Sequence, residues 1–304
     1  TVSATLDAVD ARLDDQFLLP VAPRGPAKGR TWANSAWAKG IVTGGDYEST
    51  ATQTGHTDRT GGLIIGLDAS TREHLLAGIY GGLAGNRLRA GNSLSIDSDQ
   101  HFAGLYAALR FGAFFANAGA SIGKADARTY RDEVLERIDG THANEHLGAS
   151  LGAGFVLDAW KDARIKPSVS VRHTRIKLKN YEERGDGAML VPDFDDTLAQ
   201  GVARVQADQK FTLLGRPAAA GLALGWKQSL RDPRRSVDAA FVHSPGTVVS
   251  LETDDFYNKG SAQMLGLSLR VAPTRNSIIA LECERETAAD SVRHTASLTV
   301  GCSW

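Results

Sequence analysis

The feature that most constrains this chain is an alternation of apolar with small or polar residues, kept up over unusually long segments. In the last segment, positions 294, 296, 298, 300, 302 and 304 carry His, Ala, Leu, Val, Cys and Trp. The positions between them carry Thr, Ser, Thr, Gly and Ser. Successive side chains of a β-strand point to opposite faces. Such a segment therefore predicts a strand that separates an apolar medium from a polar one.

Twelve segments of this kind follow one another between Thr31 and Trp304. They cover approximately 31–44, 58–70, 73–86, 97–111, 112–126, 144–158, 163–178, 199–212, 217–230, 259–272, 276–287 and 292–304. Strands of soluble sheets usually have ~5–6 residues, whereas a tilted strand that crosses a bilayer needs ~9–11. An even number of long strands, with tight turns at one end and mostly long loops at the other, predicts an all-β outer-membrane barrel.

A soluble β-sandwich is the main alternative, since it shares the alternation. Its inward faces, however, would carry large apolar residues, whereas one face here consists of Gly, Ser, Ala, Arg and Asn. A mean hydropathy of -0.21 is compatible with a barrel, because the lipid-facing and lumen-facing residues cancel. With 34 Lys and Arg against 35 Asp and Glu, the chain lacks the basic excess of a nucleic-acid binder. We expect no nucleic-acid partner.

The N-terminal residues follow a different period. Val2, Leu6, Val9, Leu13 and Phe17 are three or four positions apart, which predicts an amphipathic helix over 1–19. A Pro- and Gly-rich linker over 20–30 follows it. The segment has no signal-peptide pattern. This leaves a cytoplasmic protein or the C-terminal piece of a longer precursor as alternatives.

Several motifs occur in a characteristic order over nearly all of the chain. The first strand opens with Trp32-Ala-Asn-Ser-Ala-Trp-Ala-Lys-Gly40, and the second contains Thr60-Gly-Gly-Leu-Ile-Ile-Gly-Leu-Asp68. The chain ends in the aromatic residue Trp304. Together with the preceding helix, these motifs resemble the translocator domain of classical (type Va) autotransporters, and the Ser-Trp ending is similar to the pertactin-like branch.

This resemblance implies a function and a location. The expected fold is a twelve-stranded antiparallel barrel over 31–304 with the N-terminal helix in its lumen. The expected role is to insert in the outer membrane of a Gram-negative bacterium and to secrete an N-terminal passenger. The implied partners are that passenger, the barrel-assembly machinery and outer-membrane lipid, for a monomer without a cofactor or metal. In the last strand, the residues of the assembly signal would be Leu298, Val300 and Trp304.

The parity of the strands predicts which charged residues line the lumen. They are Arg110, Arg172, Arg204, Asp208, Lys210, Lys227, Arg270, Glu282 and Glu284. The residues that we assign to the plug helix are Leu6, Asp7, Asp10, Arg12, Leu13, Asp14 and Phe17. We expect the aspartates of the helix to meet lumen arginines, and Arg12 to meet an acidic patch near Glu282 and Glu284. Alternatively, these charges face lumen water.

Three further expectations concern single features. Cys283 and Cys302 fall on lipid-facing positions of the last two segments, too far apart for a disulfide. The residues that suit aromatic girdles are Phe111, Phe114, Trp160, Trp226 and Trp304. The region 231–258 contains strand-like stretches and predicts an additional hairpin above the membrane.

Two other functions stay open at this point. One family of outer-membrane lipases is also a twelve-stranded barrel, and His101, His173 and His294 have outward parity, but spacing assigns no serine partner to them. A general porin is the second alternative. We expect no catalytic residue, although Asp208, Glu282 and Glu284 are candidates for promoting self-cleavage of a passenger junction, as occurs in some autotransporters.

Overall fold

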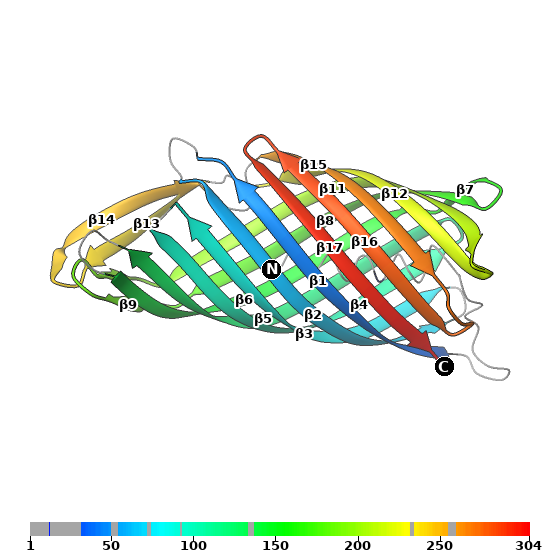
Figure 1. The fold of residues 1–304 in the computed structure, drawn as a ribbon, viewed down its shortest axis with the longest axis horizontal. Helices are drawn as coiled ribbons and strands as arrows, with labels where there is room; N and C mark the ends of the chain where they lie inside the picture. The colour runs from blue at the N-terminus through cyan, green and yellow to red at the C-terminus, as the bar shows by residue number, and fades with distance from the viewer. Residues whose placement is uncertain are drawn as a thin grey trace.

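The computed structural model describes residue 12 and residues 32–49, 54–71, 74–91, 93–132, 137–231, 234–254 and 260–304. Within these residues the chain forms a closed antiparallel barrel (Figure 1). The barrel closes because β1 (Trp32–Tyr47) pairs with β2 (His56–Thr71) on one side and with β17 (Ser291–Ser303) on the other. The predicted all-β antiparallel barrel is therefore confirmed. No helix among the described residues is long and apolar enough to cross a membrane.

Twelve of the described strands form the wall. Besides β1, β2 and β17, they are β3 (Leu75–Ala90), β4 (Leu94–Phe111), β5 (Phe114–Asp132), β6 (Arg137–Phe155), β8 (Ala163–Leu178), β11 (Phe194–Leu213), β12 (Arg216–Ser229), β15 (Ser261–Val271) and β16 (Ser277–Ala288). The remaining strands are short or lie outside the wall: β7 (Leu157–Trp160), β9 (Tyr181–Arg184), β10 (Met189–Val191), β13 (Arg234–Phe241) and β14 (Ser244–Asp254).

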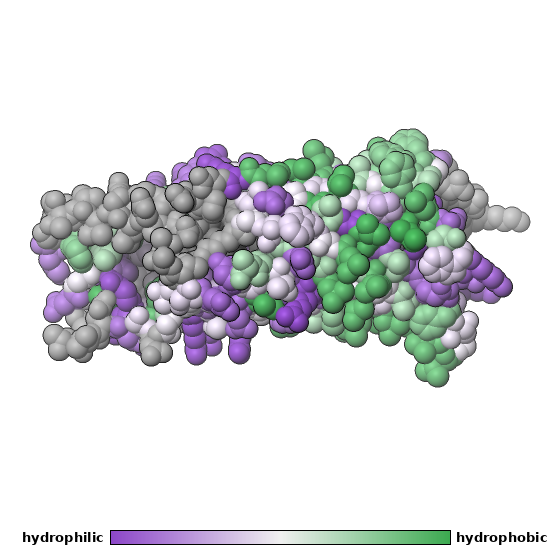
Figure 2. Space-filling view, turned by 90° about the horizontal axis from the view of Figure 1, so that it is seen from above, coloured by the Kyte–Doolittle hydropathy of each residue, from purple (hydrophilic) through white to green (hydrophobic). Residues whose placement is uncertain are grey.

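The outer face carries an apolar band next to the tight turns. Leu105 is 59% exposed, whereas the next residue, Tyr106, is 1% exposed and points into the barrel. Figure 2 shows the apolar surface gathered toward one end of the molecule and a hydrophilic surface toward the other. All five residues predicted for the aromatic girdles are exposed on the outer face.

Several strands extend further toward the long loops than the alternation predicts. The region 127–143, predicted as a loop, is largely strand, because β5 runs to Asp132 and β6 begins at Arg137. Above the apolar band the outward positions carry charged residues, such as Lys124, Asp126 and Arg128. The contrast is inverted there, because the inward residues between them, such as Ala125 and Ala127, are apolar and buried.

The predicted hairpin over 231–258 is confirmed as a β-hairpin outside the wall. β13 pairs with β14, and β12 pairs directly with β15, so the hairpin adds no strand to the barrel. It contacts β10 at the loop end of the barrel (Figure 1). The predicted helix 1–19 and linker 20–30 lie outside the described residues, except for Arg12, whose backbone is helical.

Candidate functional site

In the half of the lumen nearer the tight turns, aromatic side chains fill one side and pack on glycines of neighbouring strands. Trp37 of β1, Tyr80 of β3 and Tyr106 of β4 belong to one buried cluster. A Cβ atom on Gly66 would lie 2.4 Å from the Trp37 ring, and one on Gly78 would lie 2.4 Å from the Tyr106 ring. Because real side chains do not approach so closely, these two positions require glycine. The rings thus fix the shape of the lumen on the β1–β4 side.

Arg12 is held inside the barrel by a buried carboxylate. Its Nε donates to Asp68 Oδ2 at 2.8 Å, and its Nη2 donates to Ser35 Oγ at 2.9 Å. Tyr106 also donates to Asp68, at 2.8 Å, and accepts a hydrogen bond from Trp37 Nε1 at 2.9 Å. The side chains of Arg12 and Asp68 are only 2% and 0% exposed. Such a pair is well satisfied, and removal of either member leaves a buried charge.

The prediction that Arg12 meets Glu282 and Glu284 is therefore wrong. The alternation of the strand correctly placed Glu282 and Glu284 on the inner face. It could not show which inward acid, among those on different strands, would pair with Arg12. The β1–β2 register sets Ser35 opposite Asp68, so that two oxygen-bearing side chains converge on Arg12. Asp68 was absent from the predicted lumen residues. It could have been identified as the last residue of the second-strand motif.

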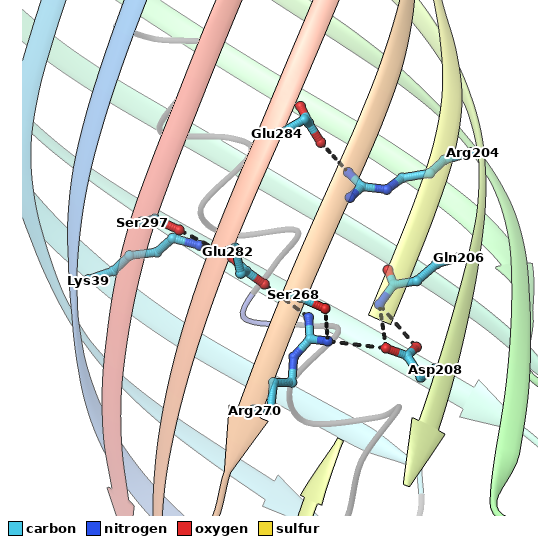
Figure 3. Close-up of polar contacts among 9 residues, drawn as sticks. All are labelled: Lys39, Arg204, Gln206, Asp208, Ser268, Arg270, Glu282, Glu284 and Ser297. Carbon is cyan, nitrogen blue, oxygen red and sulfur yellow. Dashed lines mark hydrogen bonds and ion pairs between the residues drawn. The ribbon is translucent and has the colours of Figure 1, made fainter. Parts of the chain in front are cut away.

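A ladder of glutamates lies on β16, which is separated from β1 only by β17. Lys39 Nζ lies 2.7 Å from Glu282 Oε2, and Arg204 Nη1 lies 3.0 Å from Glu284 Oε2 (Figure 3). One step higher, Lys227 and Arg293 both pair with Glu286. Successive inward positions of one strand are thus neutralised by cations from neighbouring strands, which ties β1, β11, β12, β16 and β17 together through the lumen.

Arg270 joins this ladder to a second acid. Its Nη2 lies 2.9 Å from Glu282 Oε1 and its Nη1 lies 3.2 Å from Asp208 Oδ1 (Figure 3). Ser268 accepts from the same guanidinium at 2.9 Å, and Gln206 donates to Asp208. The Arg270 side chain is 2% exposed, so this cluster is shielded from lumen water far more than Arg204, whose side chain is 32% exposed.

The other predicted lumen residues are spread over the height of the barrel. Arg172 is buried in the lumen, and Lys210 is half-buried near the tight turns. Arg110 lies at the same end, where it donates to the Gly112 carbonyl oxygen at 3.0 Å. The predicted partners of these cations, the aspartates of the helix, lie outside the described residues, so that their pairing stays a prediction. Inward parity of β1, β16 and β17 could have identified Lys39, Glu286 and Arg293 as well.

The loop half of the lumen contains buried histidines. His142 stacks on Tyr181 of β9 with ring centroids 4.6 Å apart. Burial lowers the pKa of His142 and raises the pKa of Tyr181. His142 and His146 are four residues apart, which on a helix would suit a metal, but on β6 this spacing separates their Cα atoms by ~13 Å. Among the described residues no group of three or more His, Cys, Asp or Glu could hold a metal ion.

A Gly-x-Ser-x-Gly sequence at 148–152 has no catalytic geometry. A nucleophile elbow places its serine on a sharp turn between strand and helix. Ser150 instead lies within β6, paired opposite Gly119 and Arg172, and its side chain is buried.

The seam of the barrel contains the residues predicted as the assembly signal. Leu298, Val300 and Trp304 are all exposed on the outer face. The amide nitrogen of Trp304 donates to the Asn34 carbonyl oxygen at 3.0 Å, and Asn34 returns a bond to Trp304 at 3.3 Å. Cys283 and Cys302 are free and exposed, as predicted; Cys283 pairs opposite Ala296, six residues before Cys302.

A family model for the autotransporter beta-domain matches residues 36–282. The chain belongs to this family. The translocator domain of the autotransporter NalP from Neisseria meningitidis superposes with a TM-score of 0.74 at 14% identity, covering 99% of this chain and 97% of that one. The beta domain of the Bordetella autotransporter BrkA gives a TM-score of 0.68 at 15% identity, covering 90% and 100%.

The chain is also similar to part of a longer extracellular enzyme. An extracellular serine protease of Serratia marcescens is 25% identical over 251 residues, covering 77% of this chain. The chain spans about a quarter of the length of the two such proteases that it matches. The autotransporter β-domain is a barrel of the Gram-negative outer membrane. Neither the porin nor the lipase alternative is favoured by these matches.

Proposed function

We propose that this barrel secretes a passenger, joined to its N-terminal side, to the surface of a Gram-negative cell. The observation that carries the proposal is the position of Arg12, which is 2% exposed and bonded to Asp68 inside the lumen. A residue that precedes the first wall strand thus lies within the pore. Any polypeptide attached upstream of it is connected to the barrel through the lumen, which is the arrangement that export through or beside this domain requires.

The contacts of Arg12 also support a second part of the proposal, in which the N-terminal segment closes the lumen after the passenger has been secreted. A guanidinium that exchanges water for a carboxylate, a serine hydroxyl and an aromatic ring is held in one geometry. The helix aspartates predicted to meet lumen cations would add to this attachment. A porin has no need of such a contact, so the two functions differ in what Arg12 does.

The proposed partners follow from the outer face. The exposed apolar residues of β17, with Trp304 at the end of the seam, form the surface that we assign to recognition by the barrel-assembly machinery. Outer-membrane lipid covers the apolar band, and a monomer is sufficient because β1 and β17 leave no open edge.

We assign no catalytic step to the barrel. Asp208 and Glu282 are both paired with Arg270, and Glu284 is paired with Arg204. A carboxylate held by a guanidinium is a weak base, so that these acids are better suited to structure than to self-cleavage. Incubation of the refolded domain with phospholipid tests the lipase alternative, and the appearance of free fatty acid would contradict our assignment.

The decisive experiment is display of a reporter. A folded epitope-tagged domain fused upstream of Thr1, with a signal peptide, should reach the cell surface and become accessible to antibody and protease. Deletion of residues 1–30 from the same fusion should abolish display while the barrel still assembles. A reporter that never reaches the surface, together with a conductance that the deletion leaves unchanged, would favour a porin. Display that survives the deletion would contradict the role of the N-terminal segment.

A further inference from the structure

The outer face of the wall carries three converging arginines just above the apolar band. Arg59 of β2 lies directly opposite Arg87 of β3 in the strand register, and Arg89 is the next outward residue of β3. All three are exposed. Like charges directly opposite one another destabilise a strand pair. Asp97, which pairs with Arg87, offsets part of this repulsion, and an external anion beside Arg59 would offset more of it.

The strand pair below the arginines is shaped like a groove. Proceeding toward the tight turns, the next outward pair is Gly61 opposite Gly85, and the one after it is Leu63 opposite Leu83. A Cβ atom on Gly61 would meet nothing within 4 Å. The outer wall is therefore bare of side chains at one level, with an arginine pair above it and a leucine pair, 53% and 57% exposed, below it.

Two aspartates of β4 border the same hollow. Arg87 Nε lies 2.6 Å from Asp97 Oδ1, and Asp99 lies opposite Gly85. Thr57 and the three arginines line the other side. Among the described residues only Arg87 of the three has a carboxylate within ion-pair distance. Arg59 and Arg89 therefore retain their guanidinium donors for an external acceptor, and arginine forks match phosphate in particular.

The height of the hollow suits the headgroup layer of a bilayer. Arg59 is four residues above Leu63, which is ~13 Å along the strand and roughly 10 Å in height at a tilt of ~40°. The headgroup layer occupies about the first 5–8 Å beyond the hydrocarbon core, and an arginine side chain bends back far enough to enter it.

We propose that the surface of Arg59, Arg87 and Arg89, with the Gly61–Gly85 groove beneath it, binds a phosphorylated lipid of the outer leaflet. The phosphate lies between Arg59 and Arg89, the sugar or glycerol unit lies over the two glycines, and the acyl chains follow Leu63 and Leu83. In a Gram-negative outer membrane the phosphorylated glycolipid of the outer leaflet, lipopolysaccharide, has this chemistry.

The test is a titration of the refolded full chain in nonionic detergent with diphosphorylated lipid A, followed by native mass spectrometry. Arg59→Gln/Arg89→Gln leaves the Arg87–Asp97 pair in place and should weaken binding at least tenfold. The matched control, Arg137→Gln/Lys177→Gln, removes the same charge from exposed outward positions of β6 and β8 and should change affinity less than twofold. Equal losses in both variants would overturn the site and leave only a general charge effect.

Two further arms test shape and source. Gly61→Phe fills the groove without changing any charge and should weaken binding, whereas Gly201→Phe, at an outward glycine of β11 far from β2 and β3, should not. Dephosphorylated lipid A should bind the unaltered chain at least tenfold more weakly. A water-soluble deacylated headgroup that binds as tightly as the complete lipid, or full affinity in Gly61→Phe, would refute a lipid site.

Discussion

Replacement of Asp68 by Asn should release the segment that contains Arg12 from the lumen. The substitution keeps the size of the side chain but leaves the guanidinium, 2% exposed, without its carboxylate. Breaking a buried ion pair by removing one partner costs ~3–5 kcal/mol. Both side chains are buried, so solvent does not reduce this free-energy cost. At ~1.4 kcal/mol for each tenfold change, the population with this segment undocked should rise by at least about a hundredfold.

Planar-bilayer recording of the purified domain measures this population as the open fraction of the pore. Arg175→Gln is the matched control, because it breaks the outer-wall pair Arg175–Asp195, whose side chains are 58% and 40% exposed. An exposed pair contributes ~0–1 kcal/mol, so the control should open hardly more than the unaltered protein. The double replacement Arg12→Leu/Asp68→Leu removes both charges and should be milder than Asp68→Asn alone. If Asp68→Asn and Arg175→Gln gave the same open fraction, the reasoning would fail.

Three other predictions follow from the lumen. Gly66→Val should reduce the yield of the heat-modifiable folded band on a denaturing gel, because its Cβ would overlap the Trp37 ring; normal yield would show that the ring moves away. Arg270→Met should lower unfolding stability by ~3–5 kcal/mol in denaturant titrations, whereas Arg204→Met, whose side chain is 32% exposed, should cost about 1 kcal/mol or less. The pKa of His142 is lowered in the folded barrel. Protonation of His142 therefore favours the unfolded chain, so the barrel loses stability as the pH falls below the unfolded pKa of ~6.5. His142→Phe should keep the ring stacking and reduce the difference in protease resistance between pH 7.5 and pH 5.

The wall could be predicted from the sequence because lipid and lumen impose opposite requirements on alternate residues. Leu298 and Val300 alternate with Ser297 and Thr299, and the structure places the first pair outside and the second inside. The extension of β5 to Asp132 was missed because the pattern inverts above the apolar band, where charged residues face outward and small buried residues such as Ala127 face inward. A search for large apolar residues on the outward face finds only the part of the strand that meets lipid.

The sequence predicted which residues face the lumen but not which of them form ion pairs with one another. Parity identified Asp208, Arg270 and Glu282 as inward residues, and the structure joins all three. It could not show that Arg12 would choose Asp68, because that choice depends on the β1–β2 register and on the hydroxyl of Ser35. Register is a property of strand pairs, and no single strand contains it.

The seam between β1 and β17 sets an order of events in the life of the protein. These two strands are separated by all ten other wall strands in chain order, yet they pair residue by residue and share the bonds between Asn34 and Trp304. During synthesis β1 has no partner on this side until β17 has been made, and an open sheet edge is prone to pair with other chains. Until β17 has been made and paired with it, β1 must therefore be shielded by a chaperone or an assembly factor, and anything attached upstream waits through the same interval.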